Sequence, residues 1–521
     1  MERETGQGAQ HTATQQRPGL RVTRRQILWG SLALAAAPLL NACSSSLATP
    51  TSAPAAAGGA ATKPAGTAAP AATTGGGAAP TPVPPTATAI PDIPRAKSSA
   101  KVTGKIKVIM HEDYHPDQNA FLRAEIQEFC KVNNWPLELS TATGFQGTGD
   151  LLTALTAAVQ AGNSPDMFFQ DIGVYQYQAN GVLQTVTDLT KEMIAKYGDP
   201  PSGYYDTTFF NNEWWGVPFY TRAGGMYVRA DIFQQDGLDP IKDTETYDKL
   251  RDTALKISKP DSKMWGWGMT INRSGDGNSM VQNVLMRYGS VVQDEAGQVV
   301  KFNSPETVAG LNWLKETYSD KKWANALPPG VNSWTDPSNN EAFLAGTIAI
   351  TDNAGTMYAK AVHDKVPFYQ NILFIQRPVR IKDNARLDSL AGDRFHVIKG
   401  AKNKDAAYDL IRHLLSEPVQ KQIWSISTGY ALPAYKNGWS DPIITGNKNS
   451  MAAQPIAYNP NHFTGLRWPG PPSSAMDTIS GGTYYTDMMA EVLQGKSADD
   501  VAKSYHQRFV QIFKDNGLKG E

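Results

Sequence analysis

The sequence has few cysteines. Its 521 residues include only two, Cys43 and Cys130, so a scaffold held together by several disulfides is excluded. Cys130 lies on the apolar stripe of an expected helix with Leu122, Ile126 and Phe129, where a free thiol behaves as a small core residue. We therefore expect Cys130 to be buried in the folded protein without a disulfide partner.

The sequence also lacks an excess of charge of either sign and any lysine- or arginine-rich run. It has 49 basic and 49 acidic side chains, with 41% apolar and 19% charged residues. That balance is typical of a soluble globular protein and shows no electrostatic footprint of nucleic-acid binding. The length is enough for two or three domains, and no nucleic-acid partner is predicted.

The apolar run near the start of the chain is too short to span a bilayer. In RVTRRQILWGSLALAAAPLLNAC, three arginines precede an apolar stretch of about 14 residues, an order that predicts an export signal. Thr23-Arg24-Arg25 resembles the start of a twin-arginine signal. An ordinary secretory signal remains the alternative.

The end of this signal resembles the lipobox of bacterial lipoproteins. Its residues are Leu40-Asn41-Ala42-Cys43, which implies cleavage before Cys43, a lipid on its thiol and an extracytoplasmic location at the cell membrane. Removing residues 1–42 takes away five arginines and two acidic residues, which leaves 44 − 47, a net charge of −3. That sign argues against anionic lipid as a target, so membrane contact is expected through the lipid anchor alone.

Residues 44–100 contain no aromatic side chain and consist mainly of alanine, threonine, proline, glycine and serine. Such a segment cannot bury enough apolar surface to offset the entropy of ordering. Residues 43–100 are therefore predicted to be a lipidated cysteine followed by a disordered tether with a typical reach of about 40 Å. The folded part would work near a membrane surface but clear of it.

From residue 101 onward, short apolar runs alternate with helical patterns. GKIKVIM, PLELST and DMFFQ predict three strands, and apolar positions recur at helical spacing between them. The order βαβαβ predicts an α/β fold with a parallel sheet and helices on both faces. Ligands of such sheets bind at loops that follow the carboxyl ends of the strands.

The segment HEDYH, residues 111–115, has the letters of a zinc protease motif. Such proteases hold both histidines on one helical face. Here the motif follows a strand, and Pro116 disfavours helical angles at His115, so the helix should begin at Pro116 or after it. We predict no metal site and place residues 111–114 in a loop that lines a cleft, with a zinc-dependent hydrolase as the alternative.

Several longer segments carry a family resemblance between about residues 105 and 515. They are AVQAGNSPDMFFQD, GVLQTVTDL, EWWGVPFYTRAGGMYVRADIFQQDGL, TYDKLRDTALKI, NEAFLAGTIAITDNAG and AGDRFHVIKGAKNKDAAYDLIRHLLSEPVQKQIW. In this order, behind a lipobox and a tether, the chain resembles extracellular solute-binding lipoproteins of ABC importers, family 1, the class that includes maltose-type sugar binders.

The resemblance implies a periplasmic-binding-protein-like fold, in which two α/β lobes are joined by a hinge of crossover segments and close on a solute in the cleft between them. Carried onto this chain, lobe 1 takes residues 101–222 and 386–428, and lobe 2 takes residues 226–385 and 429–521. Ala223-Gly224-Gly225 interrupts a strand-like segment and is expected to contribute to the hinge, with a β-bulge as the alternative.

The implied function is a receptor that reversibly binds a small polar solute, with a mono- or oligosaccharide favoured, and delivers it to the transmembrane subunits of an ABC permease. The sequence contains neither a G-x-S-x-G elbow nor a G-x-x-x-x-G-K-[ST] loop. We predict that the protein is not an enzyme and needs no cofactor. A carboxylate-dependent hydrolase and a scaffold or sensor with another protein partner stay open.

Sugar recognition combines aromatic rings that stack on C–H faces with planar polar side chains that pair with hydroxyls. We selected residues of these kinds at loops that should reach the cleft, and we assigned Trp265 and Trp267 to the core. The expected ligand-binding residues are Asp113, Tyr114, Gln170, Asp171, Tyr220, Arg222, Trp334, Asp352, Asn353, Asp393, Tyr430 and Trp468.

Two features leave the identity of the solute open. Thr356 and Met357 stand where many sugar-binding relatives carry a stacking aromatic residue, which argues against a long maltodextrin-like ligand. Arg222, Arg394 and His111 could instead pair with an anionic solute such as a sugar phosphate.

Overall fold

The computed structural model describes residues 92–113, 115–143, 149–388, 390–459 and 468–521. All of them belong to one compact unit of the chain, Val83–Glu521. Among the helices in these ranges, none combines the length and the apolar character that a membrane span requires. The predicted signal, Cys43 and the tether up to residue 91 lie outside the described residues, and so does Tyr114.

The larger of two main sheets has six strands in the order β12-β6-β11-β3-β1-β2. Strand β1 pairs in parallel with both β2 and β3, which confirms the predicted parallel βαβαβ unit. Strand β11 runs antiparallel to β3 and β6, and β12 antiparallel to β6. The strands are β1 (Ile106–Glu112), β2 (Leu137–Thr143), β3 (Met167–Gln170), β6 (Val217–Arg222), β11 (Gly392–Val397) and β12 (Ala431–Pro433).

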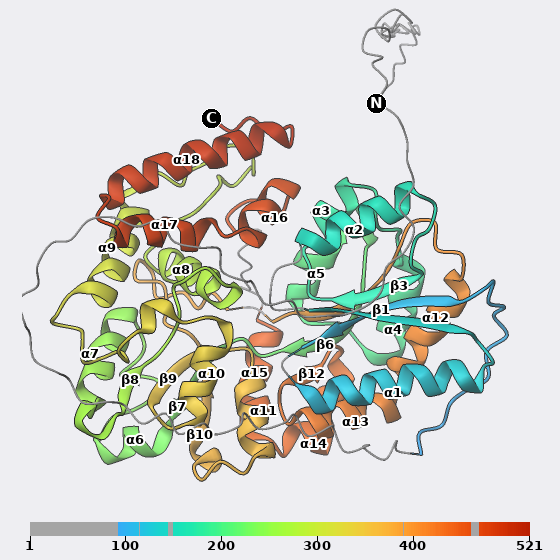
Figure 1. Ribbon diagram of the computed structural model, residues 1–521, viewed down its shortest axis with the longest axis horizontal. Coiled ribbons are helices and arrows are strands. Elements are labelled where there is room, and N and C mark those ends of the chain that lie inside the picture. Colours follow the sequence, from blue (N-terminus) through green and yellow to red (C-terminus); the bar gives the residue numbers. More distant parts are fainter. Residues whose placement is uncertain (1–91, 114, 144–148, 389, 460–467) are drawn as a thin grey trace, which may run out of the picture. The chain divides into compact units, whose positions relative to one another are not determined.

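Helices cover both faces of the larger sheet, with α1 on one side and α2 and α3 on the other (Figure 1). Cys130 is buried on the inner face of α1, without a disulfide, as the apolar stripe predicts. The helices next to this sheet are α1 (Pro116–Val132), α2 (Gly149–Gln160), α3 (Val174–Ala179), α4 (Thr187–Tyr197), α5 (Ser202–Thr208), α12 (Lys404–Leu414) and α13 (Glu417–Ser427).

The described residues of the HEDYH segment do not form a helix. His111 and Glu112 lie in β1, where we had expected a loop, and α1 begins at Pro116 as predicted. His115 caps that helix, because its side chain accepts a hydrogen bond from the backbone N–H of Gln118. The two histidines therefore do not share a helical face. Within the described ranges, no group of three or more His, Cys, Asp or Glu side chains is arranged to hold a metal ion.

The smaller main sheet has the order β10-β7-β9-β8. Its strands are β7 (Gly225–Arg229), β8 (Trp265–Trp267), β9 (Ile348–Asn353) and β10 (Ile372–Ile375), and a separate hairpin pairs β4 (Phe209–Phe210) with β5 (Glu213–Trp214). Trp267 is buried in the core of this sheet and Trp265 is partly buried against a neighbouring core, so both pack as expected.

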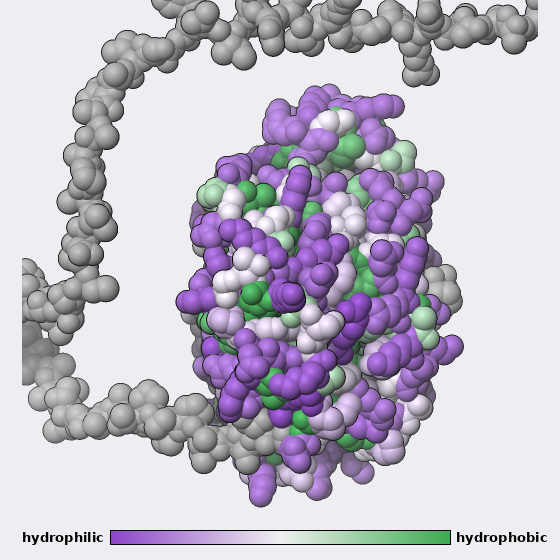
Figure 2. Space-filling model, turned by 90° about the vertical axis from the view of Figure 1, so that its right-hand side faces the viewer, coloured by the Kyte–Doolittle hydropathy of each residue, from purple (hydrophilic) through white to green (hydrophobic). Residues whose placement is uncertain are grey.

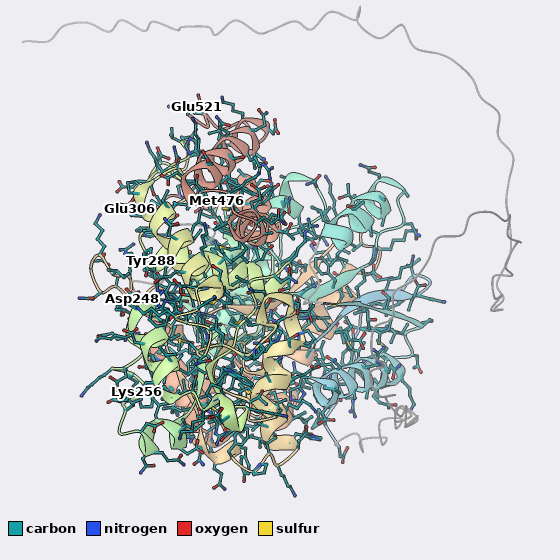
Figure 3. The ribbon with its side chains drawn as sticks, turned by 60° about the vertical axis from the view of Figure 1, so that its left-hand side comes forward. Asp248, Lys256, Tyr288, Glu306, Met476 and Glu521 are labelled. Atoms are coloured by element: carbon teal, nitrogen blue, oxygen red, sulfur yellow. The ribbon has the colours of Figure 1, made fainter. Side chains whose placement is uncertain are left out.

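Most of the remaining helices surround the smaller sheet. Figure 3 shows Asp248 of α7 near Tyr288, which follows α8, and the Tyr288 hydroxyl donates a hydrogen bond of 3.2 Å to the Asp248 carboxylate. The helices are α6 (Ala230–Gln235), α7 (Tyr247–Ile257), α8 (Gly275–Arg287), α9 (Pro305–Ser319), α10 (Asp336–Leu344), α11 (Thr356–His363), α14 (Pro442–Thr445), α15 (Lys448–Ala457), α16 (Ser474–Gly481), α17 (Tyr484–Leu493) and α18 (Ala498–Asp515).

The face drawn in Figure 2 is mainly hydrophilic, with small hydrophobic areas scattered over it. Large exposed apolar side chains among the described residues are likewise far apart in the sequence, at Tyr205, Ile241, Ile381 and Ile443. Isolated apolar side chains of this kind are normal on a soluble protein and mark no interface.

The two sheets are joined where β6 ends and β7 begins, at the predicted Ala223-Gly224-Gly225 segment. A Cβ atom at Gly225 would lie 2.5 Å from the Phe374 ring and 2.9 Å from the Ile375 carbonyl oxygen. Only glycine therefore fits at this crossing. The pairing of β12 with β6 bears on the expected lobe limits, because a boundary at residue 428 would separate two hydrogen-bonded strands.

A second contact between the two halves joins α16 to the start of α3. The Asp477 carboxylate accepts a hydrogen bond of 3.0 Å from the backbone N–H of Gln176, and the Gln176 amide donates to the Thr478 hydroxyl at 3.0 Å. A Cβ atom at Gly173 would lie 2.5 Å from Asp477. Burial raises the pKa of Asp477 to about 7, although the backbone N–H donors at α3 lower it in part.

This raised pKa predicts a stability that depends on pH. Asp477 binds its proton more tightly in the folded state, so its contribution is fully present below its unfolded pKa and is lost as the pH rises through about 7. Between about pH 5 and about pH 8, the fall in the thermal midpoint should be smaller for Asp477→Asn than for the wild type. Asp252→Asn, at an exposed position on α7, should behave as the wild type, and an equal fall in all three proteins would refute the prediction.

Candidate functional site

Charged side chains gather at one edge of the larger sheet. Parallel strands β1, β3 and β6 end there, and antiparallel strand β11 begins there. Asp113 follows β1, Asp171 follows β3, Arg222 ends β6, and Asp393 is the second residue of β11. The topology thus brings together four residues that are far apart in the sequence.

Arg222 is the centre of this cluster. Its Nη2 atom lies 2.7 Å from an Asp171 oxygen and 3.1 Å from an Asp393 oxygen, and its Nη1 atom lies 3.5 Å from an Asp113 oxygen. One guanidinium therefore links the ends of β1 and β3 to the start of β11. We refer to Arg222, these three aspartates and the residues that bond to them as the Arg222 network.

Asp393 and His111 form a buried pair behind Arg222. The His111 Nδ1 atom bonds to the Asp393 carboxylate, and the Tyr220 hydroxyl donates to the same carboxylate at 3.0 Å. Burial alone would raise the pKa of Asp393, but the charges of His111 and Arg222 outweigh it and lower that pKa to about 2. Burial alone would lower the pKa of His111, but Asp393 and then Asp113 raise it.

Arg394 fixes the loop after β3. It is fully buried, and its Nη1 atom lies 2.8 Å from an Asp171 oxygen and donates to the Gly392 carbonyl at 2.5 Å. Its Nη2 atom donates to the Ile172 carbonyl. Asp171 is therefore held by two arginines, and Arg394 is too deeply buried to contact a solute.

Tyr430 approaches the network from the start of β12. Its hydroxyl donates a hydrogen bond to the Asp113 carboxylate and lies 3.5 Å from Arg222 Nη1. Its ring stacks on His115, with centroids 6.0 Å apart. Tyr430 thus connects the network to the first turn of α1.

Exposure divides the network into an open and a closed part. The side chains of Asp171, Arg222 and Asp113 are 42%, 17% and 10% exposed, whereas that of Asp393 is 0% exposed. A solute can reach Asp171 first, and then Arg222 and Asp113. Asp393, together with its buried partners His111 and Tyr220, holds Arg222 in position from the protein interior.

Asp276 lies in the first turn of α8, in the half built on the smaller sheet. Burial, together with the carboxylates of Asp336 and Asp352, raises its pKa well above the ordinary value. The charge of Asp113 makes a smaller contribution to the same rise, so Asp276 lies within electrostatic range of the Arg222 network. Among the described side chains, no Lys, Arg or His nitrogen lies within 4.0 Å of the Asp276 carboxylate.

The network contains half of the residues that the sequence analysis selected. Tyr114 is outside the described residues. Gln170, at the end of β3, is buried one position before Asp171. The selected residues that meet in the network are Asp113, Asp171, Tyr220, Arg222, Asp393 and Tyr430.

Asp352 belongs to a different ion pair near the crossing between the sheets. Its two oxygens bond to Arg377 Nε and Nη2 at 2.5 and 2.7 Å. Arg377 also donates to the Gly224 carbonyl at 3.1 Å and lies 3.3 Å from Asp388, which pairs with Arg287 at 2.8 Å. The structure therefore ties Asp352 to the predicted hinge.

Asn353 and Trp334 have structural contacts. The Asn353 side-chain oxygen accepts hydrogen bonds from the Gly355 N–H and the Thr356 hydroxyl, both at 3.1 Å, at the start of α11. Trp334 is partly buried and packs against the cores on both sides. A ligand role for these two residues stays a prediction.

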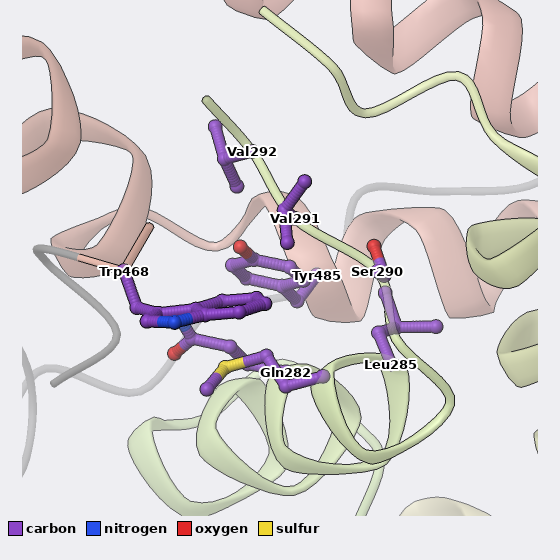
Figure 4. Close-up of a pocket in the computed structure, with 8 residues that line it drawn as sticks. Gln282, Leu285, Ser290, Val291, Val292, Trp468 and Tyr485 are labelled. Carbon is purple, nitrogen blue, oxygen red and sulfur yellow. The ribbon is translucent and has the colours of Figure 1, made fainter. Parts of the chain in front are cut away.

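Trp468 packs beside α8. Figure 4 shows its indole lying near Tyr485 and Gln282, around a cavity of about 10 Å³, which is too small for a solute and about the size that holds one water. The Arg380 guanidinium lies 4.4 Å from the centre of the Trp468 ring. These contacts give Trp468 a packing role.

The residues predicted from the sequence did not include Asp276, Arg377 or Asp388. Ser274 caps α8, and a serine before an acidic first turn is a recognisable helix start. That signal could have predicted that Asp276 lies at a helix terminus. It could not have predicted that Asp276 lies within electrostatic range of the network. Arg377 and Asp388 follow no periodic pattern, so no local signal identifies them.

A family model for bacterial extracellular solute-binding proteins matches residues 112–421. This range is more than half of the chain, and the chain belongs to this family. It confirms the resemblance seen in the sequence.

Two curated relatives are similar to the chain. One is the sn-glycerol-3-phosphate-binding periplasmic protein of Shigella dysenteriae, 25% identical over 304 residues, which cover 55% of this chain and 65% of the relative. The chain thus spans just under two thirds of that relative. The other is the maltotriose-binding protein of Pyrococcus abyssi, 20% identical over 417 residues, which cover 78% of this chain and 83% of the relative.

The fold is also that of solved solute-binding proteins. A crystal structure of an ABC transporter solute-binding protein from Thermotoga lettingae, bound to alpha-D-tagatose, superposes with a TM-score of 0.64 at 18% identity, over 79% of this chain and 100% of that one. The chain therefore has the two-lobe periplasmic-binding-protein fold that the sequence predicted.

The buried pair predicts a large cost for removing one charge. Asp393→Asn leaves Arg222 and His111 without their most buried anion, which should reduce the free energy of unfolding by about 3 to 5 kcal/mol. Urea denaturation measures this change. Asp383→Asn is the matched control, because Asp383 pairs with Arg380 at an exposed position and should change stability little. A loss for Asp393→Asn no larger than for the control would contradict the pairing.

Proposed function

We propose that the protein is an extracytoplasmic receptor that reversibly binds a neutral polar solute, with a carbohydrate favoured, and delivers it to an ABC permease. The family and the two-lobe fold support a solute-binding role. Similar proteins that bind maltotriose and alpha-D-tagatose support a carbohydrate, whereas the relative that binds sn-glycerol-3-phosphate supports the anionic alternative.

The observation that carries this proposal is the open part of the Arg222 network facing Asp276. Asp171 and Asp113 offer carboxylate oxygens from one half of the molecule, and Asp276, whose raised pKa favours the protonated form, offers a carboxyl group from the other. Sugar hydroxyls donate well to carboxylates, because charged acceptors form the stronger hydrogen bonds. A polyhydroxylated solute could therefore bond to both halves at once.

An anionic solute is less favoured. The three cations that could receive it, Arg222, Arg394 and His111, are each already bound to aspartates. A phosphate would have to displace one of these carboxylates from its cation.

Closure of the two lobes is part of the proposal. A solute that bonds to both lobes stabilises the closed state by its differential affinity for that state, and the closed state is what a permease can recognise. We keep Ala223-Gly224-Gly225 as part of the hinge. We place the end of the second segment of lobe 1 after Pro433, because β12 pairs with β6.

The proposal includes no bond cleavage. A zinc-dependent hydrolase would use His111, whose Nδ1 atom is bound to Asp393, and His115, whose Nδ1 atom accepts the N–H of Gln118. Export through a secretory or twin-arginine signal, lipidation of Cys43 and a tether to the cell membrane complete the proposal, and they rest on the sequence alone.

The proposal predicts stabilisation by a specific saccharide. The full chain should unfold at a higher temperature with one class of mono- or oligosaccharide, and a ligand at 100 times its dissociation constant should add about 2.7 kcal/mol. Asp171→Ala should lose this stabilisation, whereas Asp383→Ala, at an exposed site away from the network, should keep it. Differential scanning fluorimetry with saccharides, sugar phosphates and zinc measures the effect.

Two results would contradict this function. Stabilisation by a sugar phosphate and by no neutral sugar would favour the anionic alternative. Stabilisation by zinc alone would favour the hydrolase.

A further inference from the structure

Helix α16 contacts the start of α3, and so joins the half built on the smaller sheet to the half built on the larger sheet (Figure 1). The two segments lie close together, because a Cβ atom at Gly173 would be 2.5 Å from an Asp477 oxygen. Hydrogen bonds of 3.0 Å run from the Gln176 N–H to the Asp477 carboxylate and from the Gln176 side-chain amide to the Thr478 hydroxyl. Both bonds cross between the halves, so they break when the lobes separate here.

The contact is continuous with the solute site. Asp171, whose side chain is 42% exposed and the most accessible of the three aspartates around Arg222, lies two residues before Gly173. The carbonyl of the intervening Ile172 accepts a hydrogen bond from Arg394, which also lies 2.8 Å from an Asp171 oxygen. The loop that carries Asp171 and the start of α3 are therefore held together by one buried side chain.

Asp477 lies in this contact without a cation. It is 5% exposed, and among the described side chains no Lys, Arg or His nitrogen lies within 4.0 Å of its carboxylate. A buried carboxyl group without a paired charge is more stable when it is protonated. The protonated group can still accept the Gln176 N–H through its carbonyl oxygen.

The elements around Asp477 bring little charge to it. Helix α3 carries no charged side chain, and the hydroxyl of its Tyr175 donates to a backbone carbonyl of α5 at 2.8 Å. On α18, which packs against α16, the acidic, lysine and arginine side chains are exposed, and His506 accepts a backbone N–H at 3.3 Å. Arg394 of β11 and the N–H groups of α3 lower the pKa of Asp477, but burial outweighs them and raises it to about 7.

We propose that the contact of Asp477 with α3 is a latch that closes with the lobes and takes up a proton as it closes, so that the solute binds more tightly at low pH. It rests on the proposed function, since the solute and the closing motion are the same. With the lobes apart, Asp477 is no longer covered by α3, and its pKa returns towards that of an ordinary carboxyl group.

The sign of the pH dependence follows from this difference. The closed state holds the proton more tightly than the open state, so closure becomes more favourable as the pH falls below about 7. The advantage is lost as the pH rises through about 7. Because proton uptake and solute binding both favour the closed state, each strengthens the other.

The first test compares solute affinity in the wild type and in Asp477→Asn, with maltotriose and D-tagatose as probes. Asparagine keeps an acceptor for the Gln176 N–H and carries no charge, so it represents the protonated latch at every pH. At pH 8, Asp477→Asn should bind the saccharide more tightly than the wild type. This advantage, the ratio of the two dissociation constants, should shrink about tenfold between pH 8 and pH 6.

Asp252→Asn, at an exposed position on α7, is the matched control and should bind as the wild type does at both pH values. Titrating groups of the cleft itself affect all three proteins equally, so they cancel in the ratios. A ratio for Asp477→Asn that is the same at pH 6 and pH 8, or weaker binding by this variant at pH 8, would overturn the latch.

Hydrogen exchange tests the latch without a solute. In the full chain, mass spectrometry follows exchange of the backbone amides of residues 173–179, with the proteins compared at the same pH. At pH 8 these amides should exchange more slowly in Asp477→Asn than in the wild type, and the difference should shrink towards pH 6. This pattern without saccharide binding would support the latch and contradict the receptor function. Equal exchange in both proteins at both pH values would overturn the latch, even if a saccharide binds.

Discussion

The ion pairs of Arg222 with Asp113, Asp171 and Asp393 are the interaction on which the site depends. Each aspartate lies at the same edge of the larger sheet, because β1 and β3 end there and β11 begins there. A partly buried arginine between them compensates charges that would otherwise be costly to desolvate. The sheet topology therefore fixes both the positions of these charged side chains and the balance of their charges.

We propose that this constraint also determines which solutes fit. Because the cations are paired, the network offers carboxylate oxygens that can accept hydrogen bonds, and Asp276 adds a carboxyl group with a raised pKa from α8. The joined halves meet at two further places, the Arg377 pairs beside Gly224 and the contact of Asp477 with α3. The first lies at the proposed hinge. The second is an additional contact between the halves, and it carries a carboxylate with a raised pKa.

The parts of the site that follow strands could be predicted from the sequence. Asp113, Asp171 and Arg222 lie at strand ends, and alternating apolar runs reveal strands locally. Asp276 and Arg377 could not be found in this way, because their importance arises from contacts between segments distant in the chain. His111 was expected in a loop but lies in β1, since the strand continues to Glu112 beyond its last alternating apolar residue.

The most direct test is a crystal structure with the saccharide that stabilises the full chain. We expect its hydroxyls to bond to Asp171 or Asp113 on one lobe and to Asp276 on the other, with the Arg222 ion pairs intact. A solute bound to one lobe only, or one that separates Arg222 from Asp171, would contradict the proposed recognition of a neutral sugar.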